Sequence, residues 1–138
     1  MRPVKQKDMS GCAVACVAFV LGINYSKAKK LFKNGSKYSK FRGFYCREVV
    51  QALEESKLEY DYKYVNRRTK KLISLDKSIV FIKQSNRYPK GHYVCRAGNK
   101  WMDPWINFPD ISRVKAGLRT KLPGKPIYIL FRTKQKSI

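Results

Sequence analysis

Residues 6–22 read QKDMSGCAVACVAFVLG, and this stretch decides the fold. Almost every residue from Cys12 to Leu21 is apolar, and a glycine stands directly before and directly after the run. A helix that is apolar on all sides is buried, and glycine commonly marks the end of a helix. The stretch therefore predicts a buried helix over residues 12–21 with a cysteine in its first turn.

The position of Cys12 suits a nucleophile. A thiol in the first turn of a helix faces unpaired backbone N–H groups and the positive end of the helix dipole, which favour the thiolate and lower its pKa from about 8.5. Gln6, just ahead, can supply a side-chain N–H beside the backbone N–H of Cys12, and two such donors stabilise the oxyanion of a tetrahedral intermediate. We expect Cys12 to attack an acyl carbon and Gln6 to help hold the oxyanion.

A thiolate of this kind needs a proton carrier, and His92 is the only histidine in the sequence. The pair Gly98-Asn99 suits a two-residue hairpin turn between strands over residues 92–97 and 100–103. That turn sets the register, pairing Cys95 with Met102, Arg96 with Trp101 and Ala97 with Lys100. His92 and Asp103 then become diagonal neighbours on one face, at roughly 7–8 Å between backbones. Asp103 is predicted to orient the His92 ring, which exchanges a proton with Cys12.

The pattern changes from helical to extended along the chain. Besides the first helix, the sequence predicts a short basic helix over 27–33 capped by Ser26, a surface loop over 35–43 and a third helix over 45–56. Strands are predicted over 60–64, 78–83, 92–97, 100–103 and 126–132, followed by a charged tail over 134–138; the basic segment 66–77 has no clear assignment. Helices first and strands later favour one α+β domain over residues 1–138, with N-terminal helices packed on a C-terminal antiparallel sheet.

Composition limits the partners and the compartment. The chain of 138 residues has 31 Lys plus Arg against 9 Asp plus Glu, a formal net charge of +22. Such a charge attracts polyanions, and RNA and acidic proteins are both candidates. The apolar run is shorter than the roughly 20 residues of a membrane span and is unlike a cleavable signal. The four cysteines do not form the dense pattern of a disulfide scaffold, so we expect a soluble protein of the reducing cytoplasm.

The candidate site residues resemble those of papain-like cysteine peptidases, and most closely those of the bacterial family that removes double-glycine leader peptides from bacteriocins. That family has a glutamine, five residues, the catalytic cysteine and a second cysteine four residues on, as Gln6, Cys12 and Cys16 stand here. It also has a Gly-His-Tyr/Phe-Val strand followed by Asp-Pro, matching residues 91–94 and 103–104.

The resemblance implies a papain-like fold, no cofactor and a peptide or protein substrate. It makes Cys12 the nucleophile, His92 the general base and acid, Asp103 the orienting residue and Gln6 the oxyanion residue. The reaction expected is thiol-dependent cleavage of a peptide bond.

Other interpretations of the same residues stay open. Cys16, Cys46 and Cys95 are expected to be core residues, although they could join Cys12 around zinc. Gly91 is a candidate cleft residue, and Trp101 and Trp105 are expected either to pack in the core or to form cleft walls. A basic toxin domain of the same fold is the main alternative: it would act on or bind RNA, be delivered to a target cell and be neutralised by an acidic immunity protein. A binding module that has lost catalysis is a third.

Overall fold

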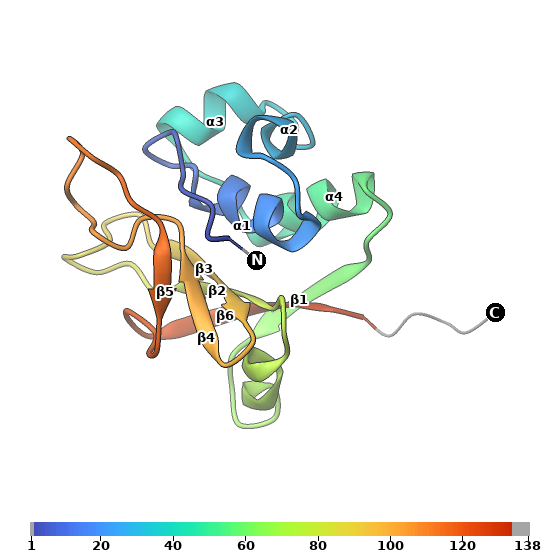
Figure 1. Ribbon diagram of the computed structural model, residues 1–138. Helices are drawn as coiled ribbons and strands as arrows, with labels where there is room; N and C mark the ends of the chain where they lie inside the picture. The colour runs from blue at the N-terminus through green and yellow to red at the C-terminus, as the bar shows by residue number, and fades with distance from the viewer. Residues whose placement is uncertain (1, 134–138) are drawn as a thin grey trace.

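The computed structural model describes residues 2–133, in which the helices precede the strands (Figure 1). In chain order the elements are α1 (Cys12–Leu21), α2 (Tyr25–Lys29), α3 (Gly35–Phe41), α4 (Cys46–Glu55), β1 (Tyr60–Tyr64), the 3-10 helix η1 (Lys70–Ser74), β2 (Ile79–Ile82), β3 (His92–Ala97), β4 (Lys100–Asp103), β5 (Gly117–Arg119) and β6 (Pro126–Arg132). The predicted α+β class is confirmed.

The strands form an antiparallel sheet in the order β1-β6-β2-β3-β4-β5. Figure 1 shows the four α-helices gathered on one side of this sheet and η1 on the other. The last strand, β6, lies between β1 and β2, so the end of the described chain is built into the sheet rather than added at its edge.

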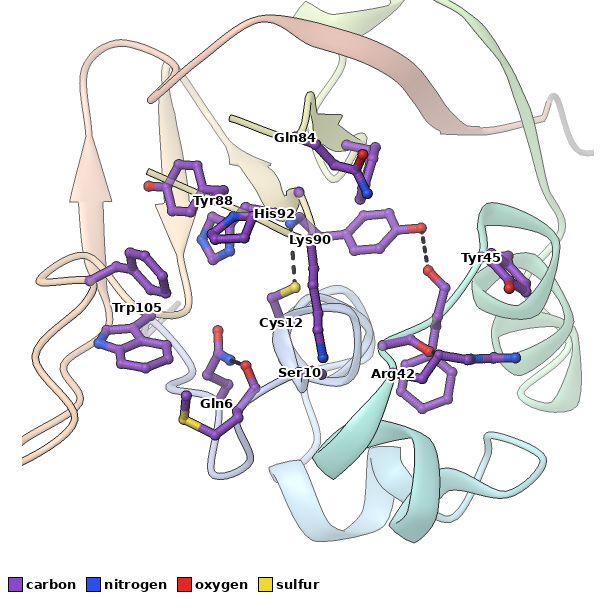
Figure 2. A pocket seen from close by; sticks show the side chains of 18 of the residues that line it. Gln6, Ser10, Cys12, Arg42, Tyr45, Gln84, Tyr88, Lys90, His92 and Trp105 are labelled. Atoms are coloured by element: carbon purple, nitrogen blue, oxygen red, sulfur yellow. Dashed lines mark hydrogen bonds between the residues drawn. The ribbon is translucent and has the colours of Figure 1, made fainter. Parts of the chain in front are cut away.

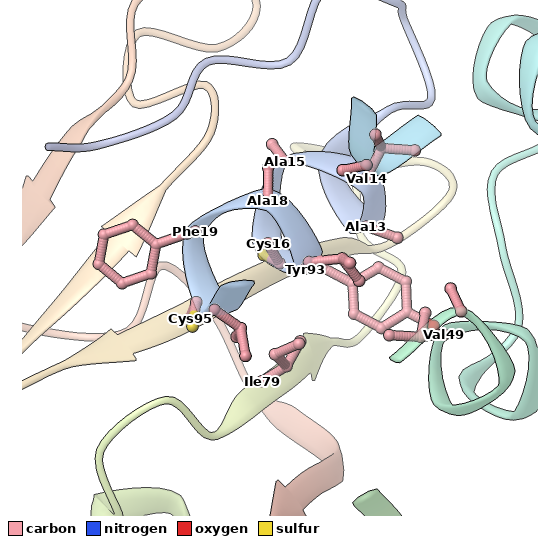
Figure 3. Packing of buried hydrophobic residues seen from close by; sticks show 14 of the residues in the cluster. Ala13, Val14, Ala15, Cys16, Ala18, Phe19, Val49, Ile79, Tyr93 and Cys95 are labelled. Carbon is pink, nitrogen blue, oxygen red and sulfur yellow. The ribbon is translucent and has the colours of Figure 1, made fainter. Parts of the chain in front are cut away.

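Helix α1 is the centre of the helical layer. Eight of its ten residues are buried, as expected for a helix that is apolar on all sides. It packs on β3, and Figure 3 shows Cys16 of the helix beside the sheet residues Tyr93 and Cys95. It ends at Gly22, which has a left-handed conformation with φ of 67°. The predicted bounds of this helix are confirmed, so Cys12 is its first residue.

Helix α4 covers the neighbouring part of the sheet through one face. Cys46, Val49, Ala52 and Leu53 are buried at helical spacing, while the carboxylate of Glu48 accepts a hydrogen bond of 2.8 Å from the backbone N–H of Tyr45 at the start of the helix. The third predicted helix is therefore confirmed, with its ends shifted by one residue.

Two predictions for the segment between these helices are wrong. The cap of α2 is Asn24, whose side chain accepts from the backbone N–H of Lys27, and the helix ends at Lys29. The segment 35–43 is not a loop, because residues 35–41 form α3. The only fully buried residues of α3 are Gly35 and Ser39, so its buried face has none of the apolar periodicity that predicts a helix.

The structure adds two elements that the sequence pattern does not indicate. The unassigned basic segment 66–77 contains η1, and the edge strand β5 has only three residues. The predicted tail over 134–138 lies outside the described residues. Within residues 2–133, no helix combines the length and the apolar character that crossing a membrane requires.

Candidate active site

The hairpin of β3 and β4 brings His92 and Asp103 together. Its register pairs Cys95 with Met102, Arg96 with Trp101 and Ala97 with Lys100, as predicted. His92 begins β3 and Asp103 ends β4, and His92 Nε2 lies 2.7 Å from Asp103 Oδ1. Both side chains are buried. Because a carboxylate only accepts, the His92 Nε2–H donates in this hydrogen bond.

Asp103 has two further partners that fix its carboxylate. The backbone N–H of Trp105 donates to Oδ1 at 3.0 Å, and Arg119 Nε donates to Oδ2 at 2.6 Å. Arg119 also donates to the carbonyl of Ile106 at 3.0 Å. Burial raises the pKa of Asp103, but the hydrogen bonds from His92, Arg119 and Trp105 outweigh it and lower the pKa to about 2. Asp103 is therefore ionised at neutral pH.

Cys12 reaches this pair from the start of α1. The backbone N–H of Tyr93, the residue after His92, donates to Cys12 Sγ at 3.4 Å (Figure 2). The two elements thus meet at their N-terminal ends, which places Cys12 and His92 side by side in one cleft. Since Nε2 of His92 is engaged by Asp103, Nδ1 is the ring nitrogen that remains for the sulfur.

The environment of His92 keeps its ring protonated. Burial lowers the pKa of His92, but hydrogen bonds to Asp103 and to Cys12, together with their charges, raise it from 6.5 to about 9. The ring is also stacked against Tyr88, with centroids 4.5 Å apart and planes inclined by 8°. An imidazolium held between a carboxylate and a sulfur stabilises negative charge on that sulfur.

Gln6 lies in the same cleft, but its amide is oriented differently from the expectation. Its Nε2 donates to the carbonyls of Asp8 at 2.9 Å and Met9 at 3.1 Å. Its Oε1 is buried and has no hydrogen-bond partner among the described residues. The position of Gln6 in the cleft fits the sequence prediction. Its side-chain N–H groups, however, donate to carbonyls of the loop between Gln6 and Cys12 and do not point into the cleft.

The loop before Cys12 is held in place by Asp8. The Asp8 carboxylate accepts from the Tyr25 hydroxyl at 2.8 Å and forms an ion pair of 3.3 Å with Lys29. Gly11 fits beneath this contact, since a Cβ at this position would lie 2.0 Å from the Tyr25 hydroxyl oxygen. Gly11 also provides no side-chain cap for α1, which leaves the backbone N–H groups of the first turn available to an acceptor.

A cleft with a volume of about 680 Å³ opens over Cys12, His92 and Gln6. Aromatic and other residues from both layers form its walls: Phe41, Arg42, Phe44 and Tyr45 from the helical layer, and Phe81, Gln84, Tyr88, Lys90, Tyr93, Trp105 and Phe108 from the sheet side. Figure 2 shows the labelled members of this set arranged around the Cys12 sulfur.

Of the three candidate cleft residues, Gly91 and Trp105 line the cleft. Trp101 does not line the cleft, and of its two expected roles the structure shows packing in the core. Its side chain is 3% exposed in a second apolar cluster with Val80, Val94 and Ile129. Trp101 shares a strand face with Asp103 but lies two residues further from the end of the strand where the cleft opens.

Several residues of the cleft, and Arg119 behind Asp103, have no clear signal in the sequence. Tyr88, Phe81 and Lys90 come from β2 and the loop that follows it, and Arg119 is one of 31 basic residues. Gly91, by contrast, has a signal in the sequence, because it stands directly before the histidine. Its φ is +77°, which favours glycine, and a Cβ there would lie 2.2 Å from the Phe81 ring.

The other three cysteines, Cys16, Cys46 and Cys95, are buried and free. Among residues 2–133, no three His, Cys, Asp or Glu side chains are grouped to hold a metal ion.

Comparisons with known proteins support the fold. No protein-family model matches the chain, and no curated protein matches it. Among solved structures it is similar to the peptidase domain of Streptococcus ComA, described as a bifunctional ABC transporter involved in a quorum-sensing pathway. The match has a TM-score of 0.56 and 20% identity, and it covers 97% of this chain and 98% of that domain. The expected resemblance is thus confirmed as a resemblance of fold.

Proposed function

We propose that this protein is a cysteine peptidase in which Cys12, His92 and Asp103 act as one unit. The observation that carries the proposal is that Cys12, whose sulfur accepts a hydrogen bond from the residue after His92, lines the same open cleft as His92, although 79 residues separate the two in the sequence. The Asp103 carboxylate behind the His92 ring, at 2.7 Å, supports the same reaction.

The chemistry follows from the protonation states. The Cys12 sulfur attacks the carbonyl carbon of a peptide bond and forms a tetrahedral intermediate. His92 then gives its proton to the leaving amine as the C–N bond breaks, which leaves an acyl group on sulfur. Water attacks this thioester, His92 takes a proton from the water, and the acid product leaves as the Cys12 sulfur is restored.

The backbone N–H of Cys12 and the side chain of Gln6 are the proposed oxyanion donors. The N–H of Gln6 that contacts the Met9 carbonyl, at 3.1 Å, makes the longer of its two hydrogen bonds and is the one we expect to turn toward the oxyanion. Loss of one such donor costs about 100-fold or more in turnover, so Gln6→Ala should lower kcat by about that factor. Gln6→Glu, which has the same shape but no N–H, should behave like Gln6→Ala.

The test of the function is cleavage in ¹⁸O-labelled water. The wild-type protein and the Cys12→Ala variant are incubated with an unfolded casein-type substrate, and the products are read by mass spectrometry. We expect new peptide C-termini that carry ¹⁸O with the wild-type protein and none with Cys12→Ala. Equal cleavage by both proteins would exclude Cys12 as the nucleophile. Casein left intact while total RNA is degraded would support the toxin interpretation instead.

A further inference from the structure

The charge of the cleft has one sign. Among the described residues that line it, Arg42 and Lys90 are the fixed cations, and none is Asp or Glu. The sequence explains why. Residues 9–47 and 77–102, which supply most of both walls, contain no acidic residue, whereas five of the nine acidic residues fall between 48 and 61: Glu48, Glu54, Glu55, Glu59 and Asp61.

Arg42 already has a partner for its charge. Its guanidinium forms an ion pair with Glu48 at 2.5 Å and lies over the Tyr38 and Tyr45 rings, with its central carbon 3.6 and 4.5 Å from their centroids. It is therefore a fixed part of the wall, and a new anion would have to compete with Glu48.

Lys90 is in a different position. Its side chain is exposed, and Nζ donates to the backbone carbonyl of Phe41 at 3.0 Å. Lys90 lies two residues before His92, on the sheet side of the cleft, while Phe41 ends α3 on the helical side. Figure 2 shows the Lys90 side chain extended across the cleft in this view. The contact thus joins the two walls near the reacting groups through a neutral acceptor.

We propose that the cleft selects peptides that carry an Asp or Glu side chain close to the scissile bond, and that Lys90 recognises this carboxylate. A carboxylate forms a shorter and stronger hydrogen bond with an ammonium group than a neutral carbonyl does. An acidic side chain that enters the cleft can therefore replace the Phe41 carbonyl as the acceptor of Lys90. This inference rests on the proposed peptidase function and names its substrate class.

The net charge of +22 attracts any anion, so a test has to separate Lys90 from the general field. Lys100 is a matched control, because it is exposed and begins β4 next to the hairpin turn, at the end of the strand away from Asp103. Lys90→Gln removes one positive charge inside the cleft, and Lys100→Gln removes one positive charge away from it.

The experiment uses a library of fluorescent heptapeptides in pairs that differ by Glu or Gln at one position. Cleavage is measured with wild-type, Lys90→Gln, Lys90→Glu and Lys100→Gln protein. Binding is measured by anisotropy with the Cys12→Ala variant, with and without Lys90→Gln. We expect the wild-type protein to cleave Glu peptides about tenfold faster than Gln peptides. This rate ratio is the advantage expected from one charge-assisted hydrogen bond over a neutral one. Lys90→Gln should remove this ratio, Lys90→Glu should reverse it, and Lys100→Gln should keep it.

The outcomes separate this inference from the function on which it rests. Equal cleavage of Glu and Gln peptides by the wild-type protein would overturn the inference and leave the peptidase in place. Equal effects of Lys90→Gln and Lys100→Gln would also overturn it, since the general field would then account for the preference. Binding of Glu peptides that depends on Lys90, without any cleavage by the wild-type protein, would overturn the peptidase and keep the acidic preference of the cleft. An RNA oligonucleotide that displaces the Glu peptides only when Lys90 is present would assign the cleft to nucleic acid and overturn the inference.

Discussion

At the scale of the residue, the proposed chemistry depends on the protonation state of His92. Hydrogen bonds to Asp103 and Cys12 raise the pKa of His92 to about 9 against the opposing effect of burial. The ring therefore holds a proton at neutral pH and can deliver it to a leaving amine. A catalytic histidine often begins the reaction as a neutral base. His92 instead begins the proposed reaction protonated and acts first as an acid.

This state predicts different pH dependences for cleavage and for alkylation. Cleavage needs the His92 proton, so kcat/KM, which reports the free protein, should fall about tenfold for each pH unit above about 9. Alkylation of Cys12 by iodoacetamide needs only the sulfur anion and should not fall in that range. The check is to measure both rates on the same protein across this range. Parallel loss of the two rates would contradict the assignment of the proton to His92.

The ring and the hydroxyl of Tyr88 are predicted to contribute differently to activity. Its ring stacks on His92 at 4.5 Å, while its hydroxyl is buried without a hydrogen-bond partner among the described residues. Tyr88→Phe removes only the unpaired hydroxyl, so kcat/KM should stay within about twofold and the free energy of unfolding should be unchanged or higher. Tyr88→Ala removes the stack and should lower kcat while shifting the alkaline limb of the pH profile, because water then reaches the His92–Asp103 pair. The alternative result is a Tyr88→Phe variant as impaired as Tyr88→Ala, which would give the hydroxyl the main role.

At the scale of the element, the front of α1 depends on the packing of Gly11 against α2. A Cβ at position 11 would lie 2.0 Å from the Tyr25 hydroxyl oxygen, which itself holds Asp8 at 2.8 Å. The N-terminal turn of α1 therefore keeps its place only with glycine there.

Gly11→Ala should displace Cys12 and lower kcat/KM by about 100-fold, the cost of a small error in the position of a reacting group. The double variant Gly11→Ala/Tyr25→Phe removes the hydroxyl that the new methyl group meets, and it should recover part of the stability lost by Gly11→Ala alone. Urea unfolding and peptide cleavage measure the two effects. Wild-type activity in Gly11→Ala would show that the loop yields without moving the nucleophile.

The same scale shows what the sequence could predict. The run from Cys12 to Leu21 and the turn at Gly98-Asn99 carry strong local signals, and both elements form where the sequence places them. These two elements bring Cys12, His92 and Asp103 together, so most of the candidate site follows from local patterns.

The parts that could not be predicted depend on tertiary packing. Helix α3 buries Gly35 and Ser39 rather than a stripe of apolar residues, and Arg119 reaches Asp103 from a strand of three residues. The direction of the Gln6 amide is set by the carbonyls of Asp8 and Met9, which no pattern in the sequence reveals.

For the whole molecule, the buried His92–Asp103 pair makes stability depend on pH. The pKa of His92 is about 9 in the folded chain against 6.5 as the ordinary value, so between these values the folded state binds the proton more tightly. The contribution is fully present below pH 6.5, and the free energy of unfolding should fall as pH rises through about 9. Asp103, with its pKa lowered from 3.8 to about 2, gives the opposite sign: its contribution is present above 3.8 and is lost as pH falls through about 2.

Urea unfolding followed at several pH values checks this prediction, with His92→Ala as the control. The alkaline decrease between pH 6.5 and about 9 should be weaker in the variant than in the wild-type protein. An identical decrease in both proteins would assign it to other groups, such as repulsion among the many cations.

The distribution of charge links the whole molecule to its cleft. No Asp or Glu lines the cleft, whereas each wall carries one cation: Arg42, which is paired with Glu48 outside the lining, and Lys90, which contacts only a neutral carbonyl. Salt should therefore weaken the binding of acidic peptides more than that of neutral ones, since screening reduces attraction between exposed charges.

The central claim is that Cys12 and His92 form one reactive unit across the junction of α1 and β3. The most direct measurement is the rate of Cys12 alkylation by iodoacetamide at neutral pH, located by mass spectrometry, in the wild-type protein and in His92→Ala. Cys12 should react first among the four cysteines, and His92→Ala should slow its reaction by about tenfold or more, because the sulfur loses the cation that stabilises its negative charge. Equal rates in the two proteins would show that Cys12 reacts without His92, and the proposed unit would be contradicted.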